Sequence, residues 1–380
     1  MTGSNETRPL RFPLHNEPRV WLLTTGTSPL SLELTRQLHS HGDFIAIAVG
    51  AEEYENSGGR IEDLKSLLAE LGDDARTRIK ILNVDLRSAG QCQAAVAETI
   101  KAWGKIDILL SCTSEAVVGA VEELSTSPET LALVRDQFET NFFGPVNIIK
   151  AALPVYRAQR TGHILVLTGI TGHIGTPGLG MYCASSWALE GFCDSLAYEV
   201  APFNVKMTIV QPNMEVNVLT NKMTFTPPMP EYASENNPAP SIREIFSNII
   251  ATGFQNGSDG GDDSGSKPQK SNSSSPVASR NKGSSSDKKS TSLYPALSQA
   301  AKLALVSETV HALIAVGGHE NPPARHIVGH EGVASVKEKL KTVSEELEDF
   351  VEVSGAVDIF KDENDLQGDA NGGAGPNANG

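Results

Sequence analysis

Several residues whose side chains could take part in proton transfer lie in or near one helix-like segment, MYCASSWALEGF. Its tyrosine, Tyr182, is a phenol, and Ser186 follows four residues later, a spacing that puts both side chains on one face of a helix. Asn141, in QFETNFFG, adds an amide, and Thr171, in the loop before the tyrosine, adds a hydroxyl. A phenol with the ordinary pKa of about 10 is almost wholly protonated at pH 7, and a neighbouring cation is the usual means of activating it. Ser186 is neutral and supplies none.

A turn suited to phosphate lies near the start of the chain. The apolar run 19–25 ends in Thr24-Thr25, is followed by Gly26 and leads into a helix-like segment, an arrangement in which N–H groups at a helix N-terminus bind phosphate. Strand-like runs at 19–25, 44–49, 79–85, 106–111, 163–168 and 205–211 alternate with helix-like segments at 31–41, 60–71, 91–103, 128–157 and 181–200. This alternation predicts an α/β fold, a Rossmann-type doubly wound parallel sheet.

Composition limits the partners. The 380 residues carry a formal net charge of -15, which argues against nucleic acid and against an anionic membrane surface. We therefore expect a small-molecule ligand or a protein partner. No apolar run approaches the roughly 20 residues that span a bilayer, and the opening MTGSNETRPLRF lacks the apolar core of a signal peptide. These features predict a cytoplasmic protein without a membrane span.

The cysteines indicate neither a metal site nor a disulfide framework. Four are present, at irregular spacings, without a CxxC pair or a clustered histidine partner. We expect plain reduced thiols and no metal ligands: Cys92, Cys112, Cys183 and Cys193.

Composition along the chain predicts one domain with additions. The stretch 255–292 is rich in Ser, Gly and Asp and nearly free of apolar residues, so little burial would offset the entropy of ordering it. We expect a flexible tail at 1–17, the Rossmann core at 18–254, a disordered insertion at 255–292, a continuation of the domain at 293–359 and a disordered tail at 360–380.

Several segments, taken together, carry a family resemblance. TTGTSPLSL follows the first strand, NVDLRS the third, and QFETNFFG and GHILVLTGITGHIGTPGLGMYCASSWALEGF come in the order and at the spacing of the short-chain dehydrogenase/reductase family. The chain resembles its steroid- and retinol-dehydrogenase-like branch. The resemblance implies NAD(P) as cofactor, a catalytic set of Asn, Ser, Tyr and Lys, and a homodimer formed through the helices at 128–157 and 181–200.

The family's cofactor motifs are degenerate here. Its TGxxxGxG glycines let backbone approach the diphosphate, but only Thr25 and Gly26 match, while Leu30 and Leu32 stand at the other two glycine positions. The NNAG motif after the fourth strand is replaced by SCTS at 111–114. Asp85 matches the residue that contacts adenine but is equally a helix cap. Asn217 stands where a threonine commonly holds the carboxamide. These losses argue against normal NAD(P) binding.

The catalytic set is also broken. The resemblance assigns the Asn and Tyr roles to Asn141 and Tyr182, the Ser position to Gly169 and the Lys position to Ser186. Glycine has no side chain to polarise a carbonyl, which leaves Thr171 as the conceivable substitute. Two interpretations follow. The favoured one is a catalytically impaired pseudoenzyme that acts as a binding or regulatory module. The other is an NAD(P)H-dependent oxidoreductase that reduces a carbonyl or oxidises an alcohol with Tyr182 and Asn141.

Overall fold

The computed structural model describes residues 15, 17–50, 60–213, 222–232 and 299–355. The chain divides into two compact units, Met1–Gly329 and His330–Gly380, and each is described by itself. The continuation expected at 293–359 is therefore shared between the two units. The insertion expected at 255–292, the tail expected at 360–380 and Asn217 lie outside the described residues.

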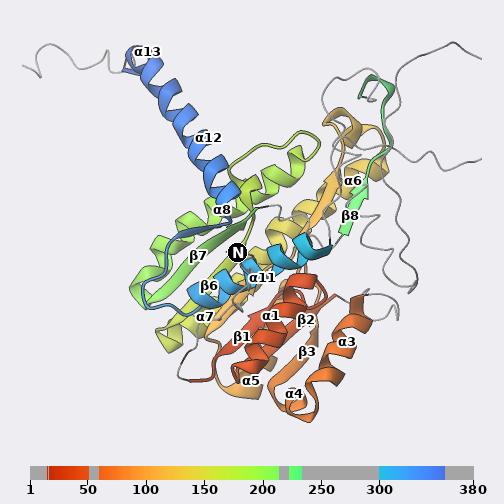
Figure 1. The fold of residues 1–380 in the computed structure, drawn as a ribbon, viewed down its shortest axis with the longest axis vertical. Coiled ribbons are helices and arrows are strands. Elements are labelled where there is room, and N and C mark those ends of the chain that lie inside the picture. Colours follow the sequence, from red (N-terminus) through yellow and green to blue (C-terminus); the bar gives the residue numbers. More distant parts are fainter. Residues whose placement is uncertain (1–14, 16, 51–59, 214–221, 233–298, 356–380) are drawn as a thin grey trace, which may run out of the picture. The chain divides into compact units, whose positions relative to one another are not determined.

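A seven-stranded parallel sheet forms the centre of the first unit (Figure 1), in the order β3-β2-β1-β4-β6-β7-β9. Its strands read as apolar runs because both faces are covered, and this confirms the predicted doubly wound α/β fold. The sequence did not reveal β9, whose four residues, RHIV, are mostly half-buried at the sheet edge. The strands are β1 (Val20–Leu23), β2 (Phe44–Val49), β3 (Ile79–Asn83), β4 (Ile108–Ser111), β6 (Gly162–Leu167), β7 (Val205–Pro212) and β9 (Arg325–Val328).

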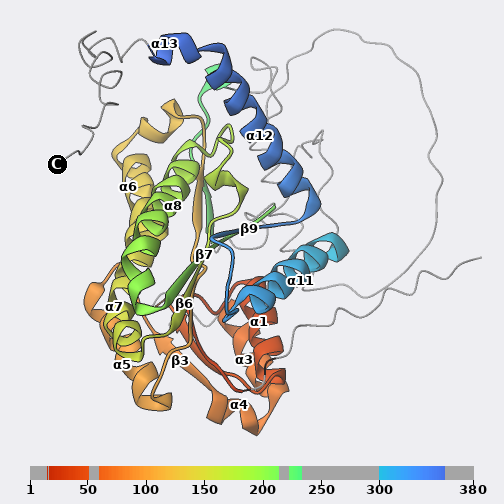
Figure 2. The same ribbon diagram turned by 90° about the vertical axis from the view of Figure 1, so that its left-hand side faces the viewer.

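Helices cover the two faces of the sheet, as the edge-on view in Figure 2 shows. One face carries α1 (Pro29–Ser40), α3 (Arg60–Leu71) and α11 (Gln299–Val316), and the short α4 (Asp73–Arg78) leads into β3. The other face carries α5 (Ala89–Trp103), α7 (Gly144–Gln159) and α8 (Gly180–Val200). Two separate apolar cores result, with Leu34 and Leu313 in the first and Ile148 and Leu196 in the second.

The helix predicted over 128–157 is interrupted. It consists of α6 (Pro128–Phe138), a π-helical turn η2 (Glu139–Phe143) and α7. A π turn inserts an extra residue, which changes the direction of the side chains that follow. Asn141 lies in this turn, and its side chain bonds to the backbone of another segment, as described below. Short 3-10 turns complete the unit: η1 (Glu122–Ser125), η3 (Ile170–Gly172), η4 (Ala201–Phe203) and η5 (Pro230–Tyr232).

A second, two-stranded sheet pairs β5 (Glu115–Val118) with β8 (Lys222–Phe225) in parallel. The pairing continues beyond the strands, because Thr226 N donates to Val118 O at 3.1 Å. Met229 N donates to the buried carboxylate of Glu123 at 2.8 Å. Residues 222–232 are therefore fastened to the segment that follows β4.

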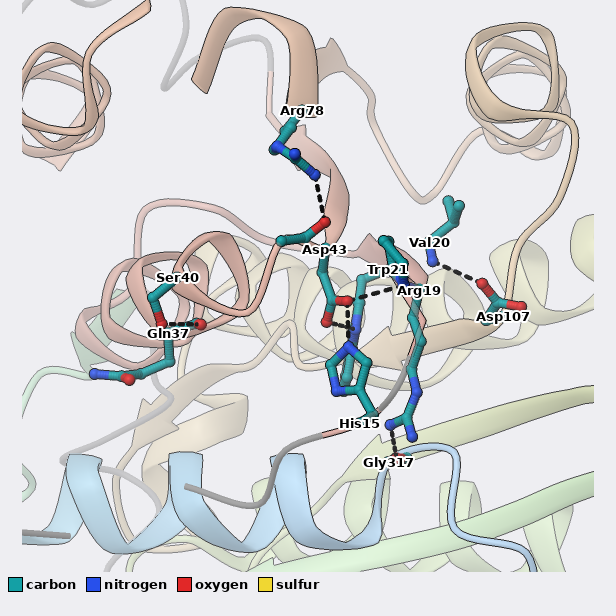
Figure 3. A network of polar contacts seen from close by, with 12 residues as sticks. His15, Arg19, Val20, Trp21, Gln37, Ser40, Asp43, Arg78, Asp107 and Gly317 are labelled. Carbon is teal, nitrogen blue, oxygen red and sulfur yellow. Dashed lines mark hydrogen bonds and ion pairs between the residues drawn. The ribbon is translucent and has the colours of Figure 1, made fainter. Parts of the chain in front are cut away.

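The amino ends of the strands carry a buried polar network around Asp43 (Figure 3). Its carboxylate, which is fully buried, accepts hydrogen bonds from Arg19 N at 2.8 Å and Trp21 Nε1 at 3.0 Å, and it also pairs with His15. The Arg19 guanidinium donates to Gly317 O at 2.6 Å, and burial lowers the pKa of this group. The network joins β1, β2 and the end of α11.

The second unit contributes α12 (His330–Asp349) and α13 (Val351–Gly355). In the described part of the chain, membrane-crossing helices are absent, since none is both long and apolar enough. All four cysteines are buried free thiols.

Candidate functional site

The order of the sheet strands reverses between β1 and β4, and ligands of doubly wound folds bind outside the carboxyl ends of the strands at such a point. Gly26 lies in the turn after β1. A Cβ atom on Gly26 would overlap Cγ2 of Ile47 in β2. The retention of this glycine therefore has a sufficient explanation in helix–strand packing.

The N-terminus of α1 is already capped by its own chain. Ser28 is the N-cap, and its hydroxyl accepts from Ser31 N at 3.1 Å. Pro29, the first helical residue, has no N–H, and Leu32 N donates to Ser28 O at 3.0 Å. Ser31 N is one of the first-turn N–H groups that a helix N-terminus would otherwise offer to a phosphate, and Pro29 has none to offer. The local sequence thus removes two donors from this turn.

The two leucines at the family's glycine positions are packing residues. Leu30 is fully buried in the core formed with Leu23 and Ile47, and Leu32 packs against the edge of that core. The sequence predicted that both side chains would stand in the path of a diphosphate. The structure shows that the turn is built around apolar packing, so bringing a diphosphate against it would require the start of α1 to move.

The turn after β4 is bonded to the turn after β1 by side chains. Thr24 Oγ1 accepts from Cys112 N at 2.9 Å, and Thr113 Oγ1 donates to Thr24 O at 3.1 Å. Ser31 Oγ lies 3.9 Å from Cys112 Sγ, within hydrogen-bonding distance for sulfur. Burial raises the pKa of the Cys112 thiol. Hydroxyl and thiol groups therefore connect the two turns across the point of strand reversal.

Asp85 is paired with Arg87. The Arg87 guanidinium donates to both carboxylate oxygens, from Nε at 2.9 Å and from Nη2 at 2.8 Å, and Arg87 N donates to the same carboxylate at 3.0 Å. These bonds lower the pKa of Asp85. The structure shows Asp85 in a local ion pair in the turn before α5. Ser88 caps α5, so the predicted capping role of Asp85 is wrong, and its predicted contact with adenine stays a prediction.

Tyr182 lies inside a small apolar cluster. Only 2% of its surface is exposed, and Ala116 and Val118 of β5 and Met223 and Phe225 of β8 pack in the same cluster. Its hydroxyl lies 3.0 Å from the hydroxyl of Ser114, within hydrogen-bonding distance. Ser114 stands at the last position of the SCTS segment. β5 and β8 are therefore packed directly against the phenol.

Ser186 bonds within its own helix. Its hydroxyl donates to Tyr182 O at 3.2 Å, four residues back, and the residue is 7% exposed. Such a bond satisfies a serine inside a helix. At this position the structure thus has a neutral hydroxyl bound to backbone, and it offers no positive charge to the phenol.

Gly169 has a backbone conformation that serine does not adopt easily. Its φ is +82° and its ψ is 174°, a region occupied almost only by glycine. The Thr171 hydroxyl donates to Thr168 O at 3.4 Å, and Thr171 O accepts from Trp187 Nε1 at 2.9 Å. Thr171 is therefore turned back toward its own loop, and the carbonyl-polarising role suggested for it has no geometric support among these contacts.

Asn141 supports the loop before β5. Its Oδ1 accepts from Glu115 N at 2.8 Å, and its Nδ2 donates to Glu115 O at 2.8 Å and to Ser185 Oγ at 3.3 Å. Ser185 Oγ in turn donates to Tyr182 O at 2.8 Å. The structure thus brings Asn141 and Tyr182 together through Ser185 of α8, and the side chain of Asn141 is bonded to the backbone of Glu115 and to the Ser185 hydroxyl.

Comparisons with known proteins agree with this architecture. A family model described as short chain dehydrogenase matches residues 19–224. The chain belongs to the short-chain dehydrogenase family. It is 33% identical over 196 residues to a 3-ketodihydrosphingosine reductase of Bacteroides thetaiotaomicron, covering 52% of this chain and 64% of the relative. It is 31% identical over 215 residues to human retinol dehydrogenase 8, covering 57% and 65%. The aligned part thus spans just under two thirds of either relative, and the second relative supports the retinol-dehydrogenase-like branch.

A solved structure of a short-chain dehydrogenase from Streptomyces avermitilis has the same fold. The TM-score is 0.62, the identity is 22%, and the match covers 89% of this chain and 99% of the other. At this identity the likeness concerns the fold alone.

This short-chain dehydrogenase does not fit a dinucleotide at its described residues. The Ser31 N–H of α1 is capped by Ser28, Asp85 is held by Arg87, and a serine bound to backbone replaces the lysine that would clamp a ribose. A dinucleotide would therefore lack the ribose clamp and would meet a turn with fewer phosphate donors. Asn217, the remaining candidate on the nicotinamide side, lies outside the described residues.

Sequence reasoning missed a buried polar cluster behind the site. Glu190 in α8, 4% exposed, accepts from Thr168 Oγ1 at 2.6 Å and from Gln211 Nε2 at 2.7 Å. Arg325 in β9 lies 3.5 Å from Glu190 and donates to Asp194 at 2.6 Å. The sequence signal for this cluster was Glu190, a charged residue on the apolar side of the helix segment ALEGF. The partners come from separate strands, and nothing in the local sequence identifies them.

Proposed function

We propose that this short-chain dehydrogenase is a catalytically impaired member of its family that acts as a binding or regulatory module. The observation that carries the proposal is the surroundings of Tyr182. The phenol is enclosed by apolar side chains of β5 and β8, its hydroxyl bonds to the neutral Ser114, and the hydroxyl at the lysine position bonds to backbone. A phenol serves as a base near neutral pH when a cation stabilises the phenolate, and Ser186 provides no charge.

The contacts of the phosphate turn support the same proposal. Capping of Ser31 N by Ser28 and the absence of an N–H at Pro29 remove two donors that a diphosphate could use. The hydroxyl and thiol contacts among Thr24, Ser31 and Cys112 would also have to be broken. A protein whose polar groups are satisfied without a ligand gains less free energy when the ligand binds.

A titration of the full chain with NADH and NADPH tests the proposal, with nicotinamide fluorescence and heat of binding as readouts. We expect neither cofactor to bind more tightly than about 1 mM, or roughly −4 kcal/mol. A micromolar dissociation constant for either cofactor would show that the capped turn opens readily, and the proposal would then be wrong.

An active NAD(P)H-dependent oxidoreductase is the second candidate. It is favoured by the link from Asn141 through Ser185 to Tyr182, which keeps two members of the family's set in one place. It is also favoured by relatives that are named as a reductase and a dehydrogenase. Reduction of a ketone or aldehyde panel by the unmodified chain, followed as loss of NADPH absorbance, would support this candidate.

Stepwise repair separates the contributions of cofactor binding and acid–base chemistry. Gly169→Ser with Ser186→Lys restores the missing side chains, and Leu30→Gly with Leu32→Gly restores the glycine turn. We expect the double variant to stay inactive, because chemistry requires a cofactor held in line. The positive φ of Gly169 adds a strain of about 1–3 kcal/mol for serine, so the thermal unfolding midpoint is measured beside activity. A double variant as active as the quadruple one would show that the turn does not limit cofactor binding.

A further inference from the structure

The segment 223–232 covers Tyr182 without being buried itself. Within this segment Thr226 alone is buried, although the phenol that it covers is 2% exposed. Met223 and Phe225 of β8 are half-buried and pack against the cluster that contains Tyr182. The segment therefore has one side on the phenol and the other side toward solvent.

The backbone bonds of this segment belong to a small sheet that is separate from the central one (Figure 1). β8 pairs with four residues of β5, and the Thr226 hydroxyl adds a hydrogen bond to Val118 O at 3.2 Å. A two-stranded sheet is marginally stable by itself. Such a pair opens at a lower cost in free energy than the strands of the central sheet.

Two adjacent carboxylates of η1 hold the end of the segment that follows β8. Glu123, which is 1% exposed, accepts from Met229 N at 2.8 Å and from Ala120 N at 2.7 Å. At the surface, Glu122 accepts from the Tyr232 hydroxyl at 2.7 Å. A buried carboxylate bonded to backbone N–H groups makes the stronger contact, since the bond is charge-assisted and shielded from water. The attachment therefore depends mainly on Glu123.

We propose that residues 222–232 form an autoinhibitory strap, which keeps Tyr182 closed to ligands until the bond between Glu123 and Met229 is released. The strap controls the same site that the proposed function describes, and the proposal rests on that function. A ligand of the Tyr182 face has to displace the side chains of β8. Its apparent affinity is therefore reduced by the fraction of molecules in which the strap is open.

Acetylation of tyrosines by N-acetylimidazole, mapped by peptide mass spectrometry in the full chain, measures how often the strap opens. Tyr198, which is 85% exposed, reports the rate of an accessible phenol. Tyr156, fully buried in the second apolar core, reports global unfolding. In the unmodified chain Tyr182 reacts far more slowly than Tyr198 but faster than Tyr156, because the strap opens more readily than the core.

Two variants loosen the strap in different ways. Glu123→Ala removes the buried acceptor of Met229 N, and Thr226→Val removes the hydroxyl bond to β5 while keeping a branched side chain. We expect the acetylation rate of Tyr182 to rise on the order of tenfold in the first variant and several-fold in the second, because each loses a buried hydrogen bond. Glu129→Ala removes an exposed carboxylate of α6 and is the matched control, with an unchanged rate.

The expected result is a rise at Tyr182 with no change at Tyr156. An unchanged Tyr182 rate in folded Glu123→Ala overturns the proposal, and if that variant does not fold, an unchanged rate in Thr226→Val overturns it. A parallel rise at Tyr182 and Tyr156 also overturns it, because the segment then opens only when the core unfolds. Acetylation needs no cofactor, so failure of the strap is distinguishable from failure of the proposed function, which the NADH and NADPH titration decides.

Discussion

The two ends of the central sheet satisfy their buried polar groups in the same manner. At the amino ends, Asp43 accepts from Arg19 N and Trp21 Nε1, and Asp107 accepts from Val20 N at 2.7 Å (Figure 3). At the carboxyl ends, where this fold binds its ligands, Thr24 bonds to Cys112 N and Ser31 approaches the Cys112 thiol. Where strand ends bind a ligand, hydrogen-bond donors and acceptors point toward that ligand. Here the polar groups at the carboxyl ends of β1 and β4 bond to other groups of the protein, as those at the amino ends do.

The difference between the edges lies in the groups used. The amino edge uses a carboxylate held by N–H donors, which is a charge-assisted arrangement. Between β1 and β4 the carboxyl edge uses neutral hydroxyls and a thiol, together with the apolar contacts of Leu30 and Tyr182, whereas the buried Glu190 carboxylate lies beside the carboxyl ends of β6 and β7. Neutral contacts contribute less to stability and are easier to replace. We therefore expect substitutions at the amino edge to destabilise the protein more than substitutions at the carboxyl edge.

The largest effect is expected from Asp43→Ala. The substitution leaves the buried N–H groups of Arg19 and Trp21 without their acceptor, which costs about 3 kcal/mol of unfolding free energy. Urea denaturation measures the loss. Asp73→Ala removes an exposed carboxylate and serves as the control, with a change within about 0.5 kcal/mol. Equal effects of the two variants would contradict the structural role of the amino edge.

Acid sensitivity is the next largest effect, and His163 is its source. This residue of β6 has Nδ1 accepting from Gly318 N at 3.0 Å and Nε2 lying 3.0 Å from Thr208 Oγ1. Burial lowers its pKa from 6.5 to about 3. Below pH 6.5 the unfolded chain therefore binds a proton that the folded chain does not, and stability falls as the pH falls from 6.5 toward about 3.

Comparison with His163→Gln isolates this contribution from that of the carboxylates. Between pH 8 and pH 5 the unmodified chain loses about 2 kcal/mol more unfolding free energy than the variant, as measured by urea denaturation at each pH. Parallel pH profiles for the two proteins would show that His163 does not stay neutral in the fold.

Gly26→Ala tests whether the glycine at the carboxyl edge has a packing role. The new methyl group overlaps Ile47, so we expect a loss of about 2 kcal/mol in the chain without any cofactor. Gly50→Ala is the matched control, because among the described residues other than its chain neighbours no atom lies within 4 Å of its Cβ position. If Gly26→Ala leaves the unfolding free energy unchanged, packing does not explain this glycine. Close approach of a cofactor to the backbone would then be the explanation.

The smallest effect concerns Tyr182 and Ser114. A double-mutant cycle of Tyr182→Phe and Ser114→Ala measures the coupling of the two hydroxyls in unfolding free energy. We expect a coupling of about 1 kcal/mol, the usual net value for a buried neutral hydrogen bond. A coupling near zero would mean that the phenol is free for other contacts, and it would weaken the case for a structural Tyr182.

The sequence by itself determined the fold class and the places of six strands. Buried parallel strands appear as continuous apolar runs and amphipathic helices as periodic ones, and both signals are local. The resemblance also located Tyr182, Asn141, Gly169 and Ser186 in order along the chain. The ends of these six strands were predicted to within a few residues, but the short strands β5, β8 and β9 were not predicted, and β9 is too short and too polar at the sheet edge to be recognised.

Only the tertiary structure decided what those residues contact. Tyr182 meets Ser114 across 68 residues, and Cys112 meets Thr24 across 88, pairs for which the sequence carries no local signal. Leu30 reads in sequence as a leucine at a glycine position, and the fold decides that its side chain lies in the core. The physical reason is that hydrogen bonds and close packing depend on distances between strands that are remote in sequence, which are set only when the sheet assembles.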